Sequence, residues 1–321
     1  MKLYLVYLIV LFSFFKVNDG FLGKTFTQFQ ELVRKERTKN ALEINVGEVE
    51  GYAFDQTLDH FEVNPNPRIF SQRFWRNKVY WREEDGPVFL YVGGEGGLDG
   101  VEIYAGHIVD MASQYRALLF SVEHRFYGKS VCKDCLKDEN LPLLSSEQAL
   151  ADLAVFVEFA KEKFGLTNKN RWFTYGGSYP GSLAAWFRIK YPHLVFGAVA
   201  SSAPVKAQVN FEGYNNVVEA SLSSPIVGGS DQCAENIKAA FQKMENLVAN
   251  RSFIKLKTDF KSCNDVSSPN DTWIFSLNLA SFIMGIVQYN EQVPGLEISS
   301  LCKRMTNASN SPYENFAKLY Q

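Results

Sequence analysis

The chain has 321 residues, enough for about two domains at ~150 residues each. Its formal net charge of -2 leaves no basic excess to neutralise phosphates, so nucleic-acid binding is excluded as a first hypothesis. With 46% hydrophobic and 21% charged residues the chain can bury a large core, which excludes disorder throughout.

The first 20 residues have the pattern of a secretory signal peptide. Lys2 precedes an apolar run over residues 3–15, and a small residue, Gly20, follows it. The alternative is a membrane anchor, but the run is shorter than the ~20 residues that cross a bilayer. The sequence therefore predicts a cleaved signal at residues 1–20 and no membrane segment in the mature protein.

Three acceptor motifs for N-glycosylation lie in the last quarter of the chain, at Asn250, Asn270 and Asn307. Such a motif arises by chance in many sequences, but three of them behind a signal peptide are more persuasive. They predict that this quarter of the chain has an exposed face.

Five cysteines are present, and disulfides are the default in an oxidising compartment. An odd number leaves one cysteine without a partner inside this chain. The close pair Cys132 and Cys135 fits half a zinc site or a redox pair, but no second pair or histidine cluster is nearby, so a loop disulfide is favoured. The pairing among Cys233, Cys263 and Cys302 stays open, and no pattern indicates a metal or a cofactor.

The segment before the first strands is polar and mixed in charge, and residues 21–50 are predicted to be a pro-segment or N-terminal extension, with a solvated helix as its simplest structure. From residue 51 to 81 the pattern becomes aromatic and alternating. This pattern predicts strands at 52–54 and 70–75, with a turn region at 64–67 between them.

Between residues 86 and 204 apolar strands alternate with helices. Strands are predicted at 88–92, 117–122, 171–175 and 195–200, and helices at 101–115, from Ser145 to 164, and from about 179 to 191. Ser145 and Gln148 form a predicted capping box, in which each side chain satisfies a free backbone N–H. Near-continuous apolar strands between helices predict a mostly parallel sheet with helices on both faces.

After Pro204 the strand pattern stops. Apolar residues recur at helical spacing from Cys233 to Val248, and the apolar run at 273–287 is too short to span a membrane. Residues 205–321 are therefore predicted to form a second, helical domain or cap.

The most informative stretch is YGGSYPG at residues 175–181, between a predicted strand and a predicted helix. A sharp turn there lifts the hydroxyl of Ser178 above the sheet, and small neighbours such as Gly176 and Gly177 are needed where strand and helix crowd each other. Pro180 suits the first turn of a helix. The N–H of Tyr179 would then face a developing oxyanion. The alternative is a glycine-rich turn with an incidental serine.

A second glycine-rich loop, GGEGG at residues 93–97, follows the predicted strand at 88–92. It lies where a hydrolase needs a second oxyanion donor, and it offers the backbone N–H groups of Gly94 and Glu95 for that role. The alternative is a nucleotide phosphate loop, but the Lys-Ser/Thr pair of that motif is missing. The two loops together favour Ser178 as a nucleophile.

Several longer stretches resemble the S28 family of serine peptidases. They are FDQTLDHF at 54–61, EHRFYGKS at 123–130, GGSYPGSLAAWFR at 176–188, YPH at 191–193 and ASSAP at 200–204. YNNVV at 214–218, IVGGS at 226–230 and GIVQY at 285–289 are most similar to the thymus-specific branch of that family. The resemblance extends from about residue 50 to near the end of the chain.

The resemblance implies an α/β-hydrolase domain with a helical cap and a Ser-Asp-His triad, in which Ser178 matches the nucleophile. Residues 51–204 would form the N-terminal part of the hydrolase domain, and 205–321 a partial cap. The family places its Asp and His after the cap, so the sequence is expected to lack both, and the sheet is expected to be incomplete at its C-terminal end. The strand at 195–200 would then lie at or near an open edge.

The four histidines of the chain do not supply the missing base. His60, His107 and His124 precede the serine, whereas the order in this fold is Ser, Asp, His. His193 lies at the far end of a helix of about 13 residues, ~20 Å long, which takes it out of hydrogen-bond reach of Ser178. All four are predicted to have structural or surface roles.

The resemblance predicts a secreted or lysosomal serine peptidase that acts on peptides, as an exopeptidase and after proline, through an acyl-enzyme at Ser178. Two alternatives remain at this point. The missing acid and base favour a non-catalytic secreted fragment or binding protein, and the elbow alone would also fit an esterase or lipase. The sequence leaves the oligomeric state open.

Overall fold

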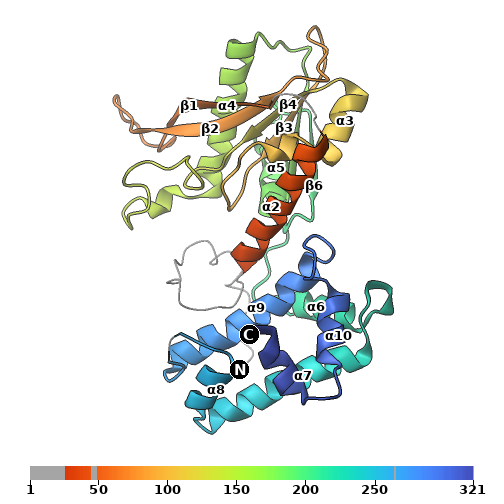
Figure 1. Cartoon of the computed structure of the whole chain (residues 1–321). Helices are drawn as coiled ribbons and strands as arrows, with labels where there is room; N and C mark the ends of the chain where they lie inside the picture. Colours follow the sequence, from red (N-terminus) through yellow and green to blue (C-terminus); the bar gives the residue numbers. More distant parts are fainter. Residues whose placement is uncertain (1–25, 45–48, 264, 321) are drawn as a thin grey trace. The chain divides into compact units, whose positions relative to one another are not determined.

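The computed structural model describes residues 26–44, 49–263 and 265–320 (Figure 1). The signal peptide predicted at residues 1–20 therefore lies outside the described residues. The chain divides into two compact units, one formed by residues 38–207 and the other by residues up to 37 together with 208–321. Each unit has its own core and is described by itself.

The unit of residues 38–207 is built on one six-stranded sheet (Figure 1). Its strands lie in the order β1-β2-β4-β3-β5-β6, and their bounds are β1 Glu50–Thr57, β2 Ile69–Asn77, β3 Val88–Val92, β4 Leu118–Val122, β5 Trp172–Gly177 and β6 Gly197–Ser201. The last four pair in parallel, whereas β1 and β2 pair antiparallel with each other and β2 pairs antiparallel with β4. The predicted mostly parallel sheet is confirmed, and its two antiparallel strands make it a mixed one.

Both faces of the sheet are covered, because successive side chains of a strand point to opposite faces. On β3, Val88, Leu90 and Val92 belong to a core that also contains residues of α4 (Ser146–Phe164) and α5 (Tyr179–Lys190). Phe89 belongs to a different core, which contains Ile108 and other residues of α3 (His107–Tyr115). This alternation explains why β3 and β4 are nearly continuous apolar runs in the sequence.

Two local predictions in this unit are wrong. The helix expected over 101–115 is broken into a short 3-10 turn, η1 (Val101–Ile103), and α3, because Gly106 between them has a φ of 97°. Ser145 does accept a hydrogen bond from the N–H of Gln148, but the capping box is not completed. The side chain of Gln148 instead accepts from the N–H of His60 and donates to Asp59.

The strand β6 is the last in the sheet order and pairs with β5. It corresponds to the segment predicted to lie at an open edge. Val195, just before it, is buried, but Phe196 and Val199 are 53% and 39% exposed. Apolar side chains at a sheet edge mark a surface that another element can cover.

The second unit is helical, and its described residues contain no strand. Its helices beyond residue 208 are α6 Gly213–Ser223, α7 Asp231–Ala249, α8 Phe253–Asp259, α9 Pro269–Gln288, α10 Ile298–Met305 and α11 Pro312–Ala317. Cys233, Ile237 and Met244 are buried in its core, as their spacing predicts. The segment at 21–50 is not simply a solvated helix, since it forms α2 (Phe26–Ile44), whose Phe29 is buried in the same core against Gly285.

The cysteines form two disulfides, Cys132–Cys135 in a loop of the sheet unit and Cys233–Cys302 between α7 and α10. Cys263 has an exposed free thiol. Asn250, Asn270 and Asn307 are all exposed. In the part of the chain that the structure describes, no helix has the length and apolar character needed to cross a membrane.

Candidate active site

Ser178 lies in the turn between β5 and α5, where the backbone is strained. Its φ of 62° and ψ of -132° fall where residues other than glycine are rare, and its side chain makes no capping hydrogen bond to the helix. The N–H of Ser178 donates to the carbonyl of Ser201 at 3.0 Å, which anchors the turn to the end of β6. The residue is exposed, so its hydroxyl is open to a reacting group.

The glycines around the turn differ in how closely they are packed. A Cβ on Gly176 would lie 2.2 Å from the carbonyl oxygen of Pro180, and one on Gly181 would lie 2.9 Å from the carbonyl oxygen of Ser201. A Cβ on Gly177 would meet no atom within 4 Å. The expectation that Gly177 is required by crowding is therefore wrong, whereas Gly176 is held between strand and helix.

The glycine-rich loop after β3 lies directly against the first turn of α5. Gly94 is buried, and a Cβ on it would lie 2.3 Å from the ring of Pro180. Burial raises the pKa of the neighbouring Glu95, and the charge of Glu95 acts on the Tyr179 hydroxyl. The structure thus brings Gly94, Glu95 and Tyr179 together around the serine turn. Tyr179 is the first residue of α5, where a backbone N–H has no partner within the helix.

A part-buried ion pair holds the far end of this loop. Glu123, which follows β4, accepts from the N–H of Leu98 at 2.9 Å, and its partner Arg73 donates to the carbonyl of Leu98 at 2.9 Å. Burial alone would raise the pKa of Glu123, but hydrogen bonds from Arg73, Ser130 and Leu98 outweigh it, so the pKa lies below its usual value. The carboxylate is therefore charged at neutral pH and fixes the N–H of Leu98, whereas Arg73 fixes its carbonyl.

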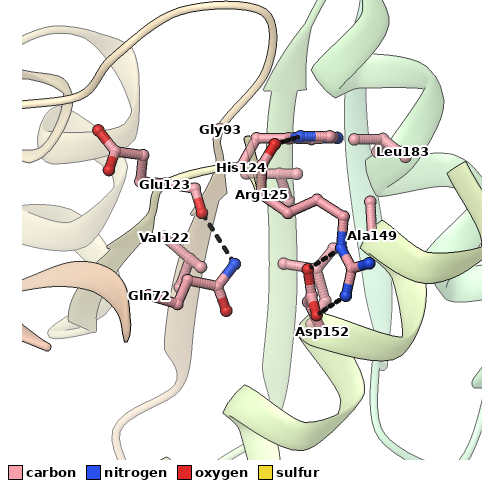
Figure 2. A pocket seen from close by; sticks show the side chains of 11 residues that line it. Gln72, Gly93, Val122, Glu123, His124, Arg125, Ala149, Asp152 and Leu183 are labelled. Carbon is pink, nitrogen blue, oxygen red and sulfur yellow. Dashed lines mark hydrogen bonds and ion pairs between the residues drawn. The ribbon is translucent and has the colours of Figure 1, made fainter. Parts of the chain in front are cut away.

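A second buried network lies around the small cavity in Figure 2. The guanidinium of Arg125 contacts both carboxylate oxygens of Asp152, at 2.7 and 2.6 Å, and donates to the carbonyls of Leu58 and Leu143. Asp152 also contacts His60 Nε2 at 2.7 Å. Sequence reasoning missed this network; its signal was Asp152 itself, a charged residue inside the apolar run at 149–157.

None of the four histidines is hydrogen-bonded to Ser178. His60 binds Asp152, His124 is buried beside Tyr179, and His107 and His193 are exposed. Among residues 26–44, 49–263 and 265–320, the structure shows no hydrogen bond between the Ser178 hydroxyl and a histidine or carboxylate side chain. It also shows no cluster of three or more His, Cys, Asp or Glu side chains that could hold a metal ion in those ranges.

The strain at Ser178 leads to a stability prediction. We expect Ser178→Gly to stabilise the sheet unit by about 1 kcal/mol, because the relief of a strained backbone, worth ~1–3 kcal/mol, exceeds the extra entropy of glycine in the unfolded chain. Ser178→Ala is the control, since alanine keeps the strain. Urea midpoints check the difference, and equal stability of the two variants would show that the turn is not strained.

A mostly parallel sheet with helices on both faces and a serine at a strand-to-helix elbow defines an α/β-hydrolase. The chain belongs to the serine carboxypeptidase S28 family, whose model matches residues 56–321. The resemblance of the motifs is confirmed by this match.

Two curated relatives give the scale of the similarity. Human thymus-specific serine protease is 39% identical over 251 residues, which cover 77% of this chain and 49% of the relative. Bovine lysosomal Pro-X carboxypeptidase is 36% identical over 200 residues, covering 60% of this chain and 39% of the relative. The chain thus spans about half the length of the thymus-specific relative. Among solved structures, Pyrococcus horikoshii acylaminoacyl peptidase matches 51% of this chain and 24% of its own, at 15% identity and a TM-score of 0.36.

Proposed function

We propose that this protein is a serine-type peptidase whose nucleophile is Ser178. The observation that carries the proposal is the exposed, strained serine at the β5–α5 elbow, in a chain of the S28 family. In this reaction Ser178 Oγ forms a bond to the carbonyl carbon of a peptide, and its proton passes through a base to the leaving amine as the C–N bond breaks. Water then releases the acyl group.

We propose the backbone N–H groups of Tyr179 and of Gly94 or Glu95 as oxyanion donors. The positions of these groups support the assignment. The loop of Gly94 packs on Pro180, and Tyr179 is the first residue of α5, where the helix dipole favours negative charge. The general base is not one of the four histidines, since His60 and His124 are bound elsewhere, and the other two are exposed and have no hydrogen bond to Ser178. We infer that the Asp and His of the family are absent from these 321 residues.

We propose peptides as substrates, cut at a chain end and next to proline. The names of the relatives support this class, above all that of lysosomal Pro-X carboxypeptidase. We propose a secreted or lysosomal location, supported by the apolar N-terminal run, the two disulfides and the three exposed acceptor asparagines.

A fluorophosphonate probe, which bonds to activated serines, tests the nucleophile. We expect a longer form of the chain that carries the Asp and His of the family to be labelled at Ser178, and Ser178→Ala to lose that labelling, since Ser178 is the only serine or threonine in residues 175–181. Ser202→Ala, a change at a nearby exposed serine, is the matched control and should leave labelling intact. Absence of label on Ser178 in the wild-type protein, read by mass spectrometry of the peptide, would contradict the proposal.

The 321-residue chain alone provides a test of the missing base. We expect it to label at least ~10³-fold more slowly than the longer form that carries the Asp and His of the family, because triad members act as a unit and removal of one leaves only residual catalysis. Equal rates would show that a base is present in this chain.

A non-catalytic secreted binding protein is the second candidate, favoured by the lack of a described acid or base at Ser178. This candidate predicts that neither form is labelled.

A further inference from the structure

Three ionisable residues follow β4 in direct succession, and all three are buried: Glu123, His124 and Arg125. The two outer residues have charged partners, Arg73 and Asp152. His124, between them, hydrogen-bonds to two uncharged groups, one of which is the side chain of the residue that follows Ser178. No step of the proposed reaction uses this imidazole.

The contacts of His124 fix the position of its proton. Nδ1 lies 2.7 Å from the carbonyl oxygen of Arg125, and a carbonyl only accepts, so Nδ1 carries the hydrogen. Nε2 lies 3.1 Å from the hydroxyl of Tyr179. In the neutral ring Nε2 is an acceptor, so the hydroxyl donates to it. Burial lowers the pKa of His124 and raises the pKa of Tyr179 to about 12, which favours this neutral pair.

The residue that follows His124 is held in place by several hydrogen bonds. Its backbone neighbour Arg125 is fully buried and held by Asp152 and by three carbonyl oxygens, those of Thr57, Leu58 and Leu143. Figure 2 shows the Arg125 and Asp152 side chains facing each other beside His124. The carbonyl that receives the Nδ1 hydrogen therefore belongs to a fixed segment, and the imidazole is fixed with it.

We propose that His124 is a positioning residue that holds Tyr179, and through it the peptide group next to Ser178, in the orientation that an oxyanion donor needs. The proposal rests on the proposed role of Ser178. The backbone of Ser178, just before Tyr179, is strained. It can relax by rotation of the peptide group between these two residues. A hydrogen bond from the hydroxyl of Tyr179 to a fixed imidazole opposes that rotation.

Two conservative variants separate this role from a merely structural one. In His124→Gln the longer amide can still accept from the Tyr179 hydroxyl, as Nε2 does, but it loses the contact with Arg125. In His124→Asn the amide can still donate to the Arg125 carbonyl, as Nδ1 does, but the Tyr179 hydroxyl loses its acceptor. His107→Asn, at an exposed histidine on α3, is the matched control.

The test is NMR of the whole chain labelled with ¹⁵N in histidine and tyrosine. Among the four histidine rings, that of His124 is assigned by the loss of its signal in His124→Gln, and the amide of Tyr179 is assigned by Tyr179→Phe. We expect His124 to carry its hydrogen on Nδ1, and the Tyr179 amide to shift in His124→Asn but not in His124→Gln or His107→Asn. A hydrogen on Nε2, or an amide that shifts in Gln and not in Asn, would overturn the proposal whether or not Ser178 reacts.

Labelling by the fluorophosphonate probe gives the functional part of the test, in the longer form that carries the Asp and His of the family. We expect His124→Asn to slow labelling of Ser178 by about 10-fold, the effect of one hydrogen bond, and His124→Gln to stay within about 3-fold of wild type. If both variants slow the labelling of Ser178 equally, His124 has only a structural role. A wild-type protein that does not label would contradict the proposed function, and the NMR result would still decide the pairing.

Discussion

Asp152→Asn is expected to destabilise the sheet unit by about 3–5 kcal/mol, because it leaves the charge of Arg125 buried without a counter-ion. The side chains of the pair are 0% and 2% exposed, so water cannot replace the lost carboxylate. Arg125 and His60 now donate to the carboxylate of Asp152, and the side-chain amide of asparagine would place an N–H donor against them. Equilibrium unfolding in urea, followed by tryptophan fluorescence, measures the loss; Trp75, Trp81, Trp172 and Trp186 all lie in this unit.

The matched control is Glu158→Gln, on the same helix α4. Its partner is Lys161, and the Glu158 side chain is 61% exposed, so the ion pair is screened by water and worth about 0–1 kcal/mol. The double variant Arg125→Met/Asp152→Leu should not recover full stability, since the carbonyls of Leu58 and Leu143 would lose their donor. A loss for Asp152→Asn no larger than for Glu158→Gln would show that the buried network does not support the fold.

The alternation of strands and helices, and the serine elbow, could be predicted from the sequence because both are local patterns. The runs at 88–92 and 117–122 are almost wholly apolar, with Ser121 as the exception, since each strand faces two cores. The elbow needs only neighbouring residues to be recognised. Gly106 was also visible in the sequence, yet the helix pattern around it concealed the break that its positive φ produces.

The pairs that hold the site together could not be predicted in this way. His124 and Tyr179 are 55 residues apart, and His60 and Asp152 are 92 apart, so their contacts follow from the sheet order rather than from any local spacing. Gln148 shows the same limit at short range. Its spacing from Ser145 fits a capping box, but the fold brings His60 and Asp59 within reach, and the amide binds them instead.

Gly176→Ala is expected to destabilise the sheet unit by about 3 kcal/mol, the upper end of the usual effect of overpacking. The new Cβ would lie 2.2 Å from the carbonyl oxygen of Pro180 and 2.7 Å from the nitrogen of Gly181. Both obstacles are backbone, so α5 must move away from β5. A displacement of ~1 Å at the reacting atoms costs ~100-fold in rate, so labelling of Ser178 should fall by about that factor.

Two neighbouring glycines provide a graded control for this change. A Cβ on Gly177 meets nothing within 4 Å, so Gly177→Ala should change the stability by less than ~1 kcal/mol and leave labelling intact. A Cβ on Gly181 would lie 2.9 Å from the carbonyl of Ser201, so Gly181→Ala should fall between the two. Because the three glycines lie close together in the chain, the order of the urea midpoints of the three variants reports how closely β5 and α5 pack at each position. Equal midpoints for Gly176→Ala and Gly177→Ala would mean that the elbow is not held by this contact.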